Sequence, residues 1–270
     1  MGILKKFFRL LIRKEFLGNF FINFLDQGIY FDRKTGTIFQ KIDDCKVQIL
    51  KAHHGIPTIN GKDMVEWVNK EIYFKFYLPK DNDVYVDIGS GYGHELLYVK
   101  NRNQSVRIFG IEANPIIYNF CKSNCFKYRS SLKVFNYMIS NTPRHLMRLD
   151  ADYAGHGSDD SGSMEVEGIT LEEFMRVNKL ETIDFLKLNV EGAENEIIAN
   201  LPFDKIKRIL VSCHDFRFER GESEFFKTYD VVKKHLINYG YLISEYDTQN
   251  APNKPWKKSM KYWIYASKAF

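Results

Sequence analysis

Residues 84–95 read Val-Tyr-Val-Asp-Ile-Gly-Ser-Gly-Tyr-Gly-His-Glu, and this stretch decides the fold. A β-branched apolar run contains an acid, Asp87, and three glycines follow at alternate positions, Gly89, Gly91 and Gly93. This order predicts a buried strand, a tight turn and then a helix, which is where α/β sheets hold nucleotide-like ligands. Glycine is expected in the turn because a ligand must contact the backbone there, and a Cβ atom would be in the way.

The spacing of the glycines indicates which ligand the turn binds. A dinucleotide fingerprint, G-x-G-x-x-G, places a pyrophosphate on the helix N-terminus and would need glycine where this chain has His94. The pattern here is D-x-G-x-G-x-G, which is typical of enzymes that use S-adenosylmethionine (SAM). SAM carries an ammonium and a sulfonium in place of phosphate, so a carboxylate near the turn suits it. Two alternatives stay open: a glycine turn that binds nothing, and a nicotinamide or flavin site.

A second acid follows at the distance expected for a ribose-binding residue. The segment from Arg107 to Glu112 is a short apolar strand that ends in the acid. An acid about 20 residues after such a turn commonly binds ribose hydroxyls, and a carboxylate can accept the two hydrogen bonds of a vicinal diol. Asn114 and Pro115 then predict the N-cap and the first residue of a helix.

Three blocks of the sequence resemble the FkbM family of SAM-dependent methyltransferases. They are Val86 to Gly93, Ile111 to Pro115, and Phe185 to Glu194, which reads Phe-Leu-Lys-Leu-Asn-Val-Glu-Gly-Ala-Glu. The resemblance covers about residues 65–215 and implies O-methylation of hydroxyls on sugars, polysaccharides or natural products. The family usually has Asp at the position of Asn189. Asparagine keeps an acceptor oxygen but loses the charge, which weakens the case for a metal-binding or base role there.

Strand and helix signals alternate from residue 84 onward. Strands are expected at 84–88, 107–112, 132–139, 184–190, 207–213, 241–246 and 262–266, and a helix at 224–238. The alternation predicts a doubly wound α/β sheet with helices on both faces. The resemblance implies the Rossmann-like class I methyltransferase order with an antiparallel last strand, in a domain that we expect to span 83–270.

Residues 1–82 are expected to form an N-terminal α+β extension. Residues 28–39 predict a hairpin around Lys34-Thr35-Gly36. A strand is expected at 47–50, and 64–76 reads as an amphipathic helix leading into the first strand of the main sheet.

The stretch 3–14 is basic and amphipathic. Its apolar side chains share one helical face and its basic side chains lie opposite, which is the composition of a helix on an anionic membrane surface. Packing on the domain and an oligomer contact are the alternatives. A cleaved signal peptide is not expected, because the apolar stretches are too interrupted and no small-residue cleavage site follows. No run of about 20 apolar residues predicts a transmembrane helix. We therefore expect a cytoplasmic protein that can contact the inner face of the membrane through this segment.

Composition excludes other classes of protein. Hydrophobic residues make up 44% of the chain, which supports a core and argues against disorder. The net charge of +5 does not by itself indicate a nucleic-acid partner. The four cysteines lack a paired CxxC pattern, so no zinc site is expected.

Ligands collect at the carboxyl ends of the strands in open α/β sheets, which locates the expected site. The residues expected to bind SAM are Asp87, Gly89, Ser90, Gly91, Tyr92, Gly93, Glu112, Ala113, Met138 and Asn189. A sugar hydroxyl needs help to lose its proton, and His214 is the leading candidate for the base because it follows a strand end and titrates near neutrality. Asp215 could orient its imidazole or cap a helix. Glu191 and Asn189 are the alternative, binding the cofactor amino group, the acceptor or, with Asp215, Mg²⁺.

We therefore expect a SAM-dependent O-methyltransferase that acts on a small-molecule, glycan or glycolipid acceptor. The resemblance does not make a metal obligatory. One alternative is a catalytically degenerate SAM-binding scaffold in a polysaccharide assembly, which Asn189 supports; another is an NAD-dependent oxidoreductase. Residues 154–163 predict a polar surface loop or a lid over the cofactor.

Overall fold

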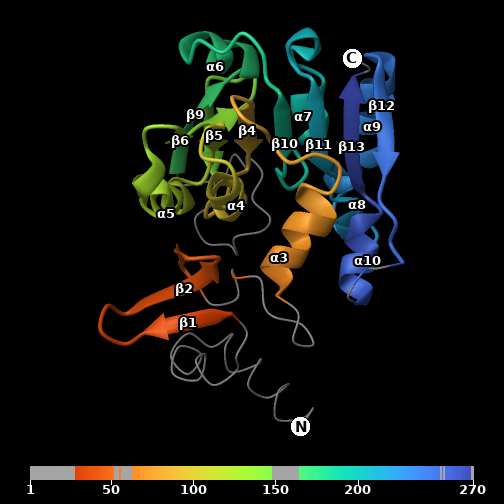
Figure 1. The fold of residues 1–270 in the computed structure, drawn as a ribbon. Helices are drawn as coiled ribbons and strands as arrows, with labels where there is room; N and C mark the ends of the chain where they lie inside the picture. The colour runs from red at the N-terminus through yellow and green to blue at the C-terminus, as the bar shows by residue number, and fades with distance from the viewer. Residues whose placement is uncertain are drawn as a thin grey trace.

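The computed structural model describes residues 28–51, 55, 63–147, 164–249, 251 and 253–268. The strands of its central sheet are β4 (Val84–Ile88), β5 (Arg107–Ile111), β6 (Leu132–Phe135), β10 (Phe185–Leu188), β11 (Arg208–Ser212), β12 (Tyr241–Glu245) and β13 (Trp263–Lys268). They are ordered β12-β13-β11-β10-β4-β5-β6 (Figure 1). All five residues of β4 are buried, as expected for a strand covered on both faces.

The directions of the strands confirm the predicted sheet. Strands β4, β5, β6, β10 and β11 pair in parallel, whereas β13 is antiparallel to both of its neighbours, β11 and β12. The chain moves outward from β4 to β6 on one side and later from β10 onward on the other. The strand order therefore reverses between β4 and β10, and a crevice is expected outside their carboxyl ends.

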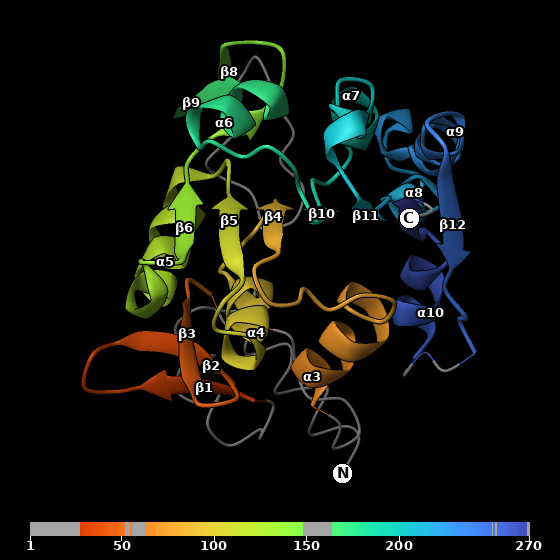
Figure 2. The same ribbon diagram turned by 45° about the horizontal axis from the view of Figure 1, so that its top comes forward.

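Helices cover both faces of the sheet (Figure 2). They are α3 (Met64–Val68), α4 (His94–Arg102), α5 (Pro115–Cys125), α6 (Leu171–Val177), α7 (Glu194–Ile198), α8 (Asp215–Phe218), α9 (Tyr229–Asn238) and α10 (Lys254–Met260). Alternate strand residues point to opposite faces. Tyr85 and Phe185 pack with α3, α4, α5 and α10, whereas Val86 and Leu186 pack with α6, α7 and α9. The doubly wound fold thus has two hydrophobic cores.

The N-terminal strands form a sheet of their own, β1 (Ile29–Asp32), β2 (Thr37–Ile42) and β3 (Cys45–Ile49), paired antiparallel in that order. This confirms the predicted hairpin, with Gly36 at a φ of +67° in its turn. The sheet lies beside α4 and α5 (Figure 2), and its buried side chains share one core with these helices. Tyr246 also donates a hydrogen bond to the carbonyl of Ile72. The domain boundary near residue 82 stays a prediction.

The prediction of one strand over 132–139 is wrong. Asn136 donates hydrogen bonds of 2.8 Å to the carbonyls of Glu112 and Ala113, and the chain leaves the central sheet there. The following strand β7 (Met138–Ile139) pairs instead with β9 (Met164–Ile169), which also pairs with β8 (Arg144–Met147). We did not predict β8 and β9.

Two predicted helices are shorter than expected. The helix predicted over 64–76 is α-helical only up to Val68. It continues as a π-helical segment, η3 (Asn69–Tyr73), and ends there. The helix predicted over 224–238 is divided into a 3₁₀ turn, η6 (Glu224–Phe226), and α9. Two further 3₁₀ turns are η4 (Phe126–Tyr128) and η5 (Phe203–Lys205). Asp215 causes the division before α9, because its carboxylate accepts from the backbone N–H groups of Thr228 and Tyr229, where α9 begins.

The predicted basic helix at 3–14 and the predicted loop at 154–163 lie outside the described residues. Within the described parts of the chain, no helix combines the length and the apolar character needed to cross a membrane.

Candidate active site

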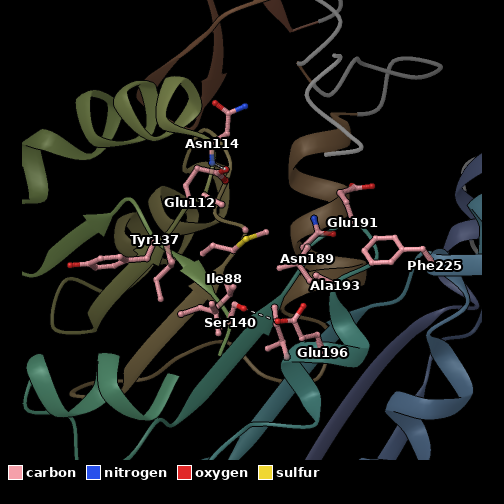
Figure 3. A pocket seen from close by; sticks show the side chains of 17 residues that line it. Ile88, Glu112, Asn114, Tyr137, Ser140, Asn189, Glu191, Ala193, Glu196 and Phe225 are labelled. Carbon is pink, nitrogen blue, oxygen red and sulfur yellow. Dashed lines mark hydrogen bonds between the residues drawn. The ribbon is translucent and has the colours of Figure 1, made fainter. Parts of the chain in front are cut away.

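A pocket lies at the carboxyl ends of β4, β5 and β10, where the strand order reverses (Figure 3). Its empty volume is about 1020 Å³, open solvent at the mouth included. The lining residues are Ile88, Gly89, Ile111, Glu112, Ala113, Asn114, Tyr137, Met138, Ile139, Ser140, Asn189, Val190, Glu191, Ala193, Glu196, Ile197 and Phe225. Five of the residues predicted to bind SAM are among them: Gly89, Glu112, Ala113, Met138 and Asn189.

Glu112 is held by two backbone amides at one end of this pocket. The N–H of Gly91 donates to Oε2 and the N–H of Asn114 donates to Oε1, both at 2.9 Å. Burial raises the pKa of the Glu112 carboxyl, and these two hydrogen bonds oppose the shift. Asn114 is also the N-cap of α5, with Pro115 as its first residue, which confirms the predicted start of that helix. Each carboxylate oxygen keeps acceptor capacity for a ligand hydroxyl.

Close contact between backbones explains Gly89. Its φ is +79°, and a Cβ atom there would lie 2.0 Å from the carbonyl oxygen of Asn189. Gly93 has a φ of +86°, and a Cβ atom would lie 2.9 Å from the Sγ of Cys125. At these two positions the chain itself requires glycine, whereas we expected the ligand to require it.

Asp87 does not line the pocket, which corrects its predicted position. It is fully buried beside Lys187, whose Nζ lies 2.9 Å from Oδ1, while the Tyr85 hydroxyl donates to Oδ2 at 2.7 Å. Burial raises the pKa of Asp87 to about 6, although Lys187 lowers it. Both oxygens are used inside the protein, so the carboxylate joins β4 to β10.

Other predicted residues of the turn also point their side chains away from the pocket. Ser90 is buried with its Oγ 3.8 Å from the Sγ of Cys121. Tyr92 is buried against Phe120, and its hydroxyl accepts from the backbone N–H of Leu50 at 3.3 Å. These side chains attach the turn to α5 and to the N-terminal sheet.

Glu191 lies at the other end of the pocket and is held by cations. Its Oε1 is 3.1 Å from Nε2 of His214, and its Oε2 is 3.1 Å from Nη1 of Arg217. Burial raises the pKa of Glu191, but the two cations outweigh burial and keep this pKa below its usual range. Its φ of +54° places it in the left-handed region, which is uncommon for a residue with a side chain. Glu191 is therefore a fixed, ionised hydrogen-bond acceptor.

His214, the predicted base, does not line the pocket. Its Nδ1 lies 2.7 Å from Oε1 of the buried Glu194, opposite the contact with Glu191. Burial lowers the pKa of His214, but the two carboxylates reverse that effect and raise it to about 10. A carboxylate oxygen faces each ring nitrogen, and this arrangement favours the protonated imidazole. It has no lone pair with which to accept a proton.

Asp215 caps a helix, one of the two roles considered for it. It accepts from the backbone N–H groups of Thr228 and Tyr229 at 3.0 and 2.9 Å, and it does not line the pocket. Its carboxylate is thus used at the start of α9. The alternative in which Asp215 binds Mg²⁺ together with Asn189 and Glu191 is not supported by this position. Among the described residues, no group of three or more His, Cys, Asp and Glu side chains has the arrangement of a metal site.

The charges of the pocket select the kind of ligand. Three of the lining side chains are carboxylic acids, Glu112, Glu191 and Glu196, and none of the described lining residues is Lys or Arg. A pyrophosphate would meet negative charge without a cation to bind it. A ligand with a sulfonium and an ammonium fits this set of side chains.

The model of the methyltransferase FkbM domain matches residues 87–243, which is more than half of the chain. The chain belongs to the FkbM methyltransferase family. Together with the fold, this membership supports a SAM-dependent methyltransferase. No curated protein matches the chain.

Several solved structures are similar to this FkbM methyltransferase at low identity. Precorrin-6y C5,15-methyltransferase from Geobacter metallireducens is 14% identical, covers 86% of this chain and 93% of its own, and has a TM-score of 0.42. The fibrillarin pre-rRNA processing protein of Methanococcus jannaschii is 16% identical over 89% and 93%, with a TM-score of 0.46. A putative caffeoyl-CoA O-methyltransferase from Staphylococcus aureus is 12% identical over 79% and 86%, with a TM-score of 0.45.

Two residues of the site in this FkbM methyltransferase, Glu196 and Phe225, were missed from sequence. The Ser140 hydroxyl donates to Oε1 of Glu196 at 2.7 Å across the pocket (Figure 3). Ser140 follows the end of the strand predicted over 132–139, where ligands are expected to collect, but Glu196 lies inside α7 and no sequence pattern indicates it. Phe225 reaches the pocket from η6, far from any predicted strand end.

Proposed function

We propose that this protein transfers the methyl group of SAM to a hydroxyl of a sugar, glycan or glycolipid. The observation that carries the proposal is the acidic pocket at the switch point of a methyltransferase sheet, with Glu112 at one end and Glu191 at the other. It supports a cationic nucleoside as ligand, and it places the ionised Glu191 carboxylate where it can accept a hydrogen bond from the second substrate.

The residues present fit SAM part by part. Glu112 would hold the ribose diol, because it lines the pocket and its two oxygens are fixed by the backbone of Gly91 and Asn114. The side chains of Tyr137, Met138 and Ile139 would enclose the adenine. The methionine end would lie against the backbone of Gly89 and Asn189, where two chain segments meet closely.

When bound, SAM supplies a methyl carbon activated by positive sulfur. In the proposed step, the acceptor oxygen forms a bond to that carbon as the carbon–sulfur bond breaks and its electron pair stays on sulfur. Glu191 orients the acceptor hydroxyl by accepting its hydrogen bond and takes up the proton as the new bond forms. His214 and Arg217 act through Glu191, because they keep its carboxylate ionised and in place.

Calorimetric titration with S-adenosylhomocysteine (SAH) tests cofactor binding. The wild-type chain should bind SAH, and Glu112→Gln should weaken binding about 10-fold or more, because hydrogen bonds to a charged group contribute roughly 1.5–3 kcal/mol. Glu181→Gln is the matched control, since Glu181 is exposed and does not line the pocket. Absence of SAH binding to the folded wild type would overturn the proposal. Asp87→Ala is unsuitable, because it leaves Lys187 buried without its partner.

Transfer of a radiolabelled methyl group to a panel of glycosides tests catalysis. The proposal expects wild-type chain, but not Glu191→Gln, to label at least one neutral glycoside at its oxygen. SAH binding without labelling of any acceptor would instead support the degenerate scaffold, which the replacement of Asp by Asn189 favours. Protection of the protein against heat by NAD but not by SAH would support an oxidoreductase.

A further inference from the structure

Phe225 is an exposed aromatic ring held at the mouth of the pocket. It is 48% exposed and lines the pocket beside Ala193 and Asn189 (Figure 3). An exposed apolar side chain is not unusual by itself. This ring, however, lies directly on the turn after β10. A Cβ atom on Gly192 would be 2.3 Å from its Cε1, and Gly192 has a φ of +109°. The turn therefore accommodates the ring only because residue 192 is glycine.

The ring and the Glu191 carboxylate are joined by a series of contacts through Phe226 and Arg217. Phe225 packs edge-to-face on Phe226, with ring centroids 5.4 Å apart. The guanidinium of Arg217 lies 3.9 Å from the centroid of Phe226, and the same guanidinium pairs with Glu191. Arg217 thus connects an exposed aromatic face to a fixed hydrogen-bond acceptor at the same end of the pocket.

The charges beside this face limit what it can bind. Glu191 is ionised and accepts hydrogen bonds, so its partner must donate them. None of the described lining residues is Lys or Arg, and His214 and Arg217 are already paired with carboxylates, so a negatively charged group would lack a cation partner in this pocket. A neutral ring that has hydroxyl groups at its edge and C–H groups on its face satisfies both conditions.

We infer that Phe225 and Glu191 form the acceptor subsite and that the acceptor is a neutral pyranose. One C–H face of the sugar packs on the Phe225 ring, and a ring hydroxyl donates to Glu191. Acidic sugars such as uronic acids are discriminated against at this subsite. The inference rests on the proposed function, because it places the sugar next to the SAM pocket.

Saturation-transfer NMR on the SAH-saturated protein tests the subsite with two matched probes, methyl β-D-glucopyranoside and methyl β-D-glucuronopyranoside. Wild type should transfer saturation to the glucoside and much less to the glucuronide. Phe225→Ala should weaken glucoside binding about 3–10-fold, which corresponds to the loss of one aromatic contact, and Phe225→Tyr should retain binding. Phe126→Ala is the control, because Phe126 is 60% exposed and lies on η4 outside the pocket.

The two proposals fail in different ways. No SAH binding by wild type contradicts the proposed function. If SAH binds but the glucoside receives no saturation, or the glucuronide receives as much, the neutral-pyranose inference is wrong. If Phe225→Ala weakens SAH as much as the glucoside, the ring belongs to the cofactor pocket and the subsite is wrong. Unchanged SAH binding together with selective loss of the glucoside supports the inference.

Discussion

Two buried histidines follow strands of the same sheet, and one is neutral at pH 7 whereas the other is positively charged. His94 is the first residue of α4 after the β4 turn, and His214 directly precedes α8 after β11. They are 6% and 2% exposed. Burial alone acts on His94 and lowers its pKa to about 4, and its Nε2 has no hydrogen-bond partner among the described residues. At His214, burial is outweighed by Glu191 and Glu194, and the pKa is raised to about 10.

The difference shows that burial does not determine the charge of a histidine. Two carboxylates within 3.1 Å of the imidazole nitrogens reverse the effect of burial at His214. At neutral pH one imidazole is neutral and the other is charged, and neither lines the pocket. The consequence for the proposed function is that Glu191 contacts the substrates, while His214 holds the Glu191 carboxylate in place through an ion pair outside the pocket.

The same substitution at both positions should separate the two states most clearly. His214→Gln removes the cation between two carboxylates, one of them fully buried, and should lower the free energy of unfolding by about 3–5 kcal/mol at pH 7. His94→Gln replaces one neutral group by another and should cost about 1 kcal/mol. Urea denaturation at pH 7 measures both. Equal losses at the two positions would mean that His214 is not charged in the folded protein.

The pH dependence of stability should distinguish the histidines next. His94 has a folded pKa of about 4, below the ordinary value of 6.5, so the unfolded chain binds the extra proton. Stability contributed by its neutral form is therefore lost as the pH falls from 6.5 to 4, by about 3 kcal/mol. His214 behaves oppositely, because its folded pKa of about 10 is raised, and its contribution is lost as the pH rises from 6.5 to 10.

Thermal unfolding of wild type and of His94→Gln across pH 4–9 measures the first of these windows, because the variant should lose less stability on the acid side. An acid-side profile that His94→Gln leaves unchanged would contradict the assignment. NMR titration of the imidazole signals provides the second measurement. His214 should show no transition between pH 5 and 8.

Most of the fold could be predicted because it depends on patterns that extend along the chain. The apolar strand from Val84 to Ile88, the glycine turn and the capped helix after Asn114 are encoded by neighbouring residues. The breaks were missed because they depend on distant contacts. Asn136 ends β6 by bonding to the chain at Glu112 and Ala113, and Asp215 sets the start of α9 from 13 residues away.

The site was predictable by position but not by orientation. Strand ends indicated Glu112, Met138 and Asn189, and all three line the pocket because these positions meet at one edge of the sheet whatever their neighbours. The same reasoning placed Asp87 and His214 in the pocket. Their partners Lys187 and Glu194 turn both side chains inward, and no local pattern shows which way a charged side chain at a strand end points.

Glu191→Gln should reveal the dependence between the charged histidine and the pocket. Loss of one carboxylate should lower the pKa of His214 below about 10, and methyl transfer to a neutral glycoside should slow about 100-fold through loss of the proton acceptor. SAH affinity should stay the same. Glu222→Gln is the matched control, because Glu222 also pairs with Arg217, at 2.6 Å, but does not line the pocket. Slowing by Glu222→Gln to the same extent would assign the effect to Arg217 instead.

Glu196 offers the smallest and most specific test, because its described contact is a neutral hydroxyl rather than a cation. Glu196→Gln keeps a group that can accept from Ser140 but removes one negative charge from the pocket. SAM carries one more positive charge than SAH, so the substitution should weaken SAM about 2–5-fold and SAH by less, as expected for a carboxylate near solvent. Calorimetry with both ligands measures the difference, with Glu173→Gln on the exposed face of α6 as control. Equal weakening of SAM and SAH would mean that Glu196 contacts a part of the ligand that the two share, and that its charge does not contribute to recognition of the sulfonium.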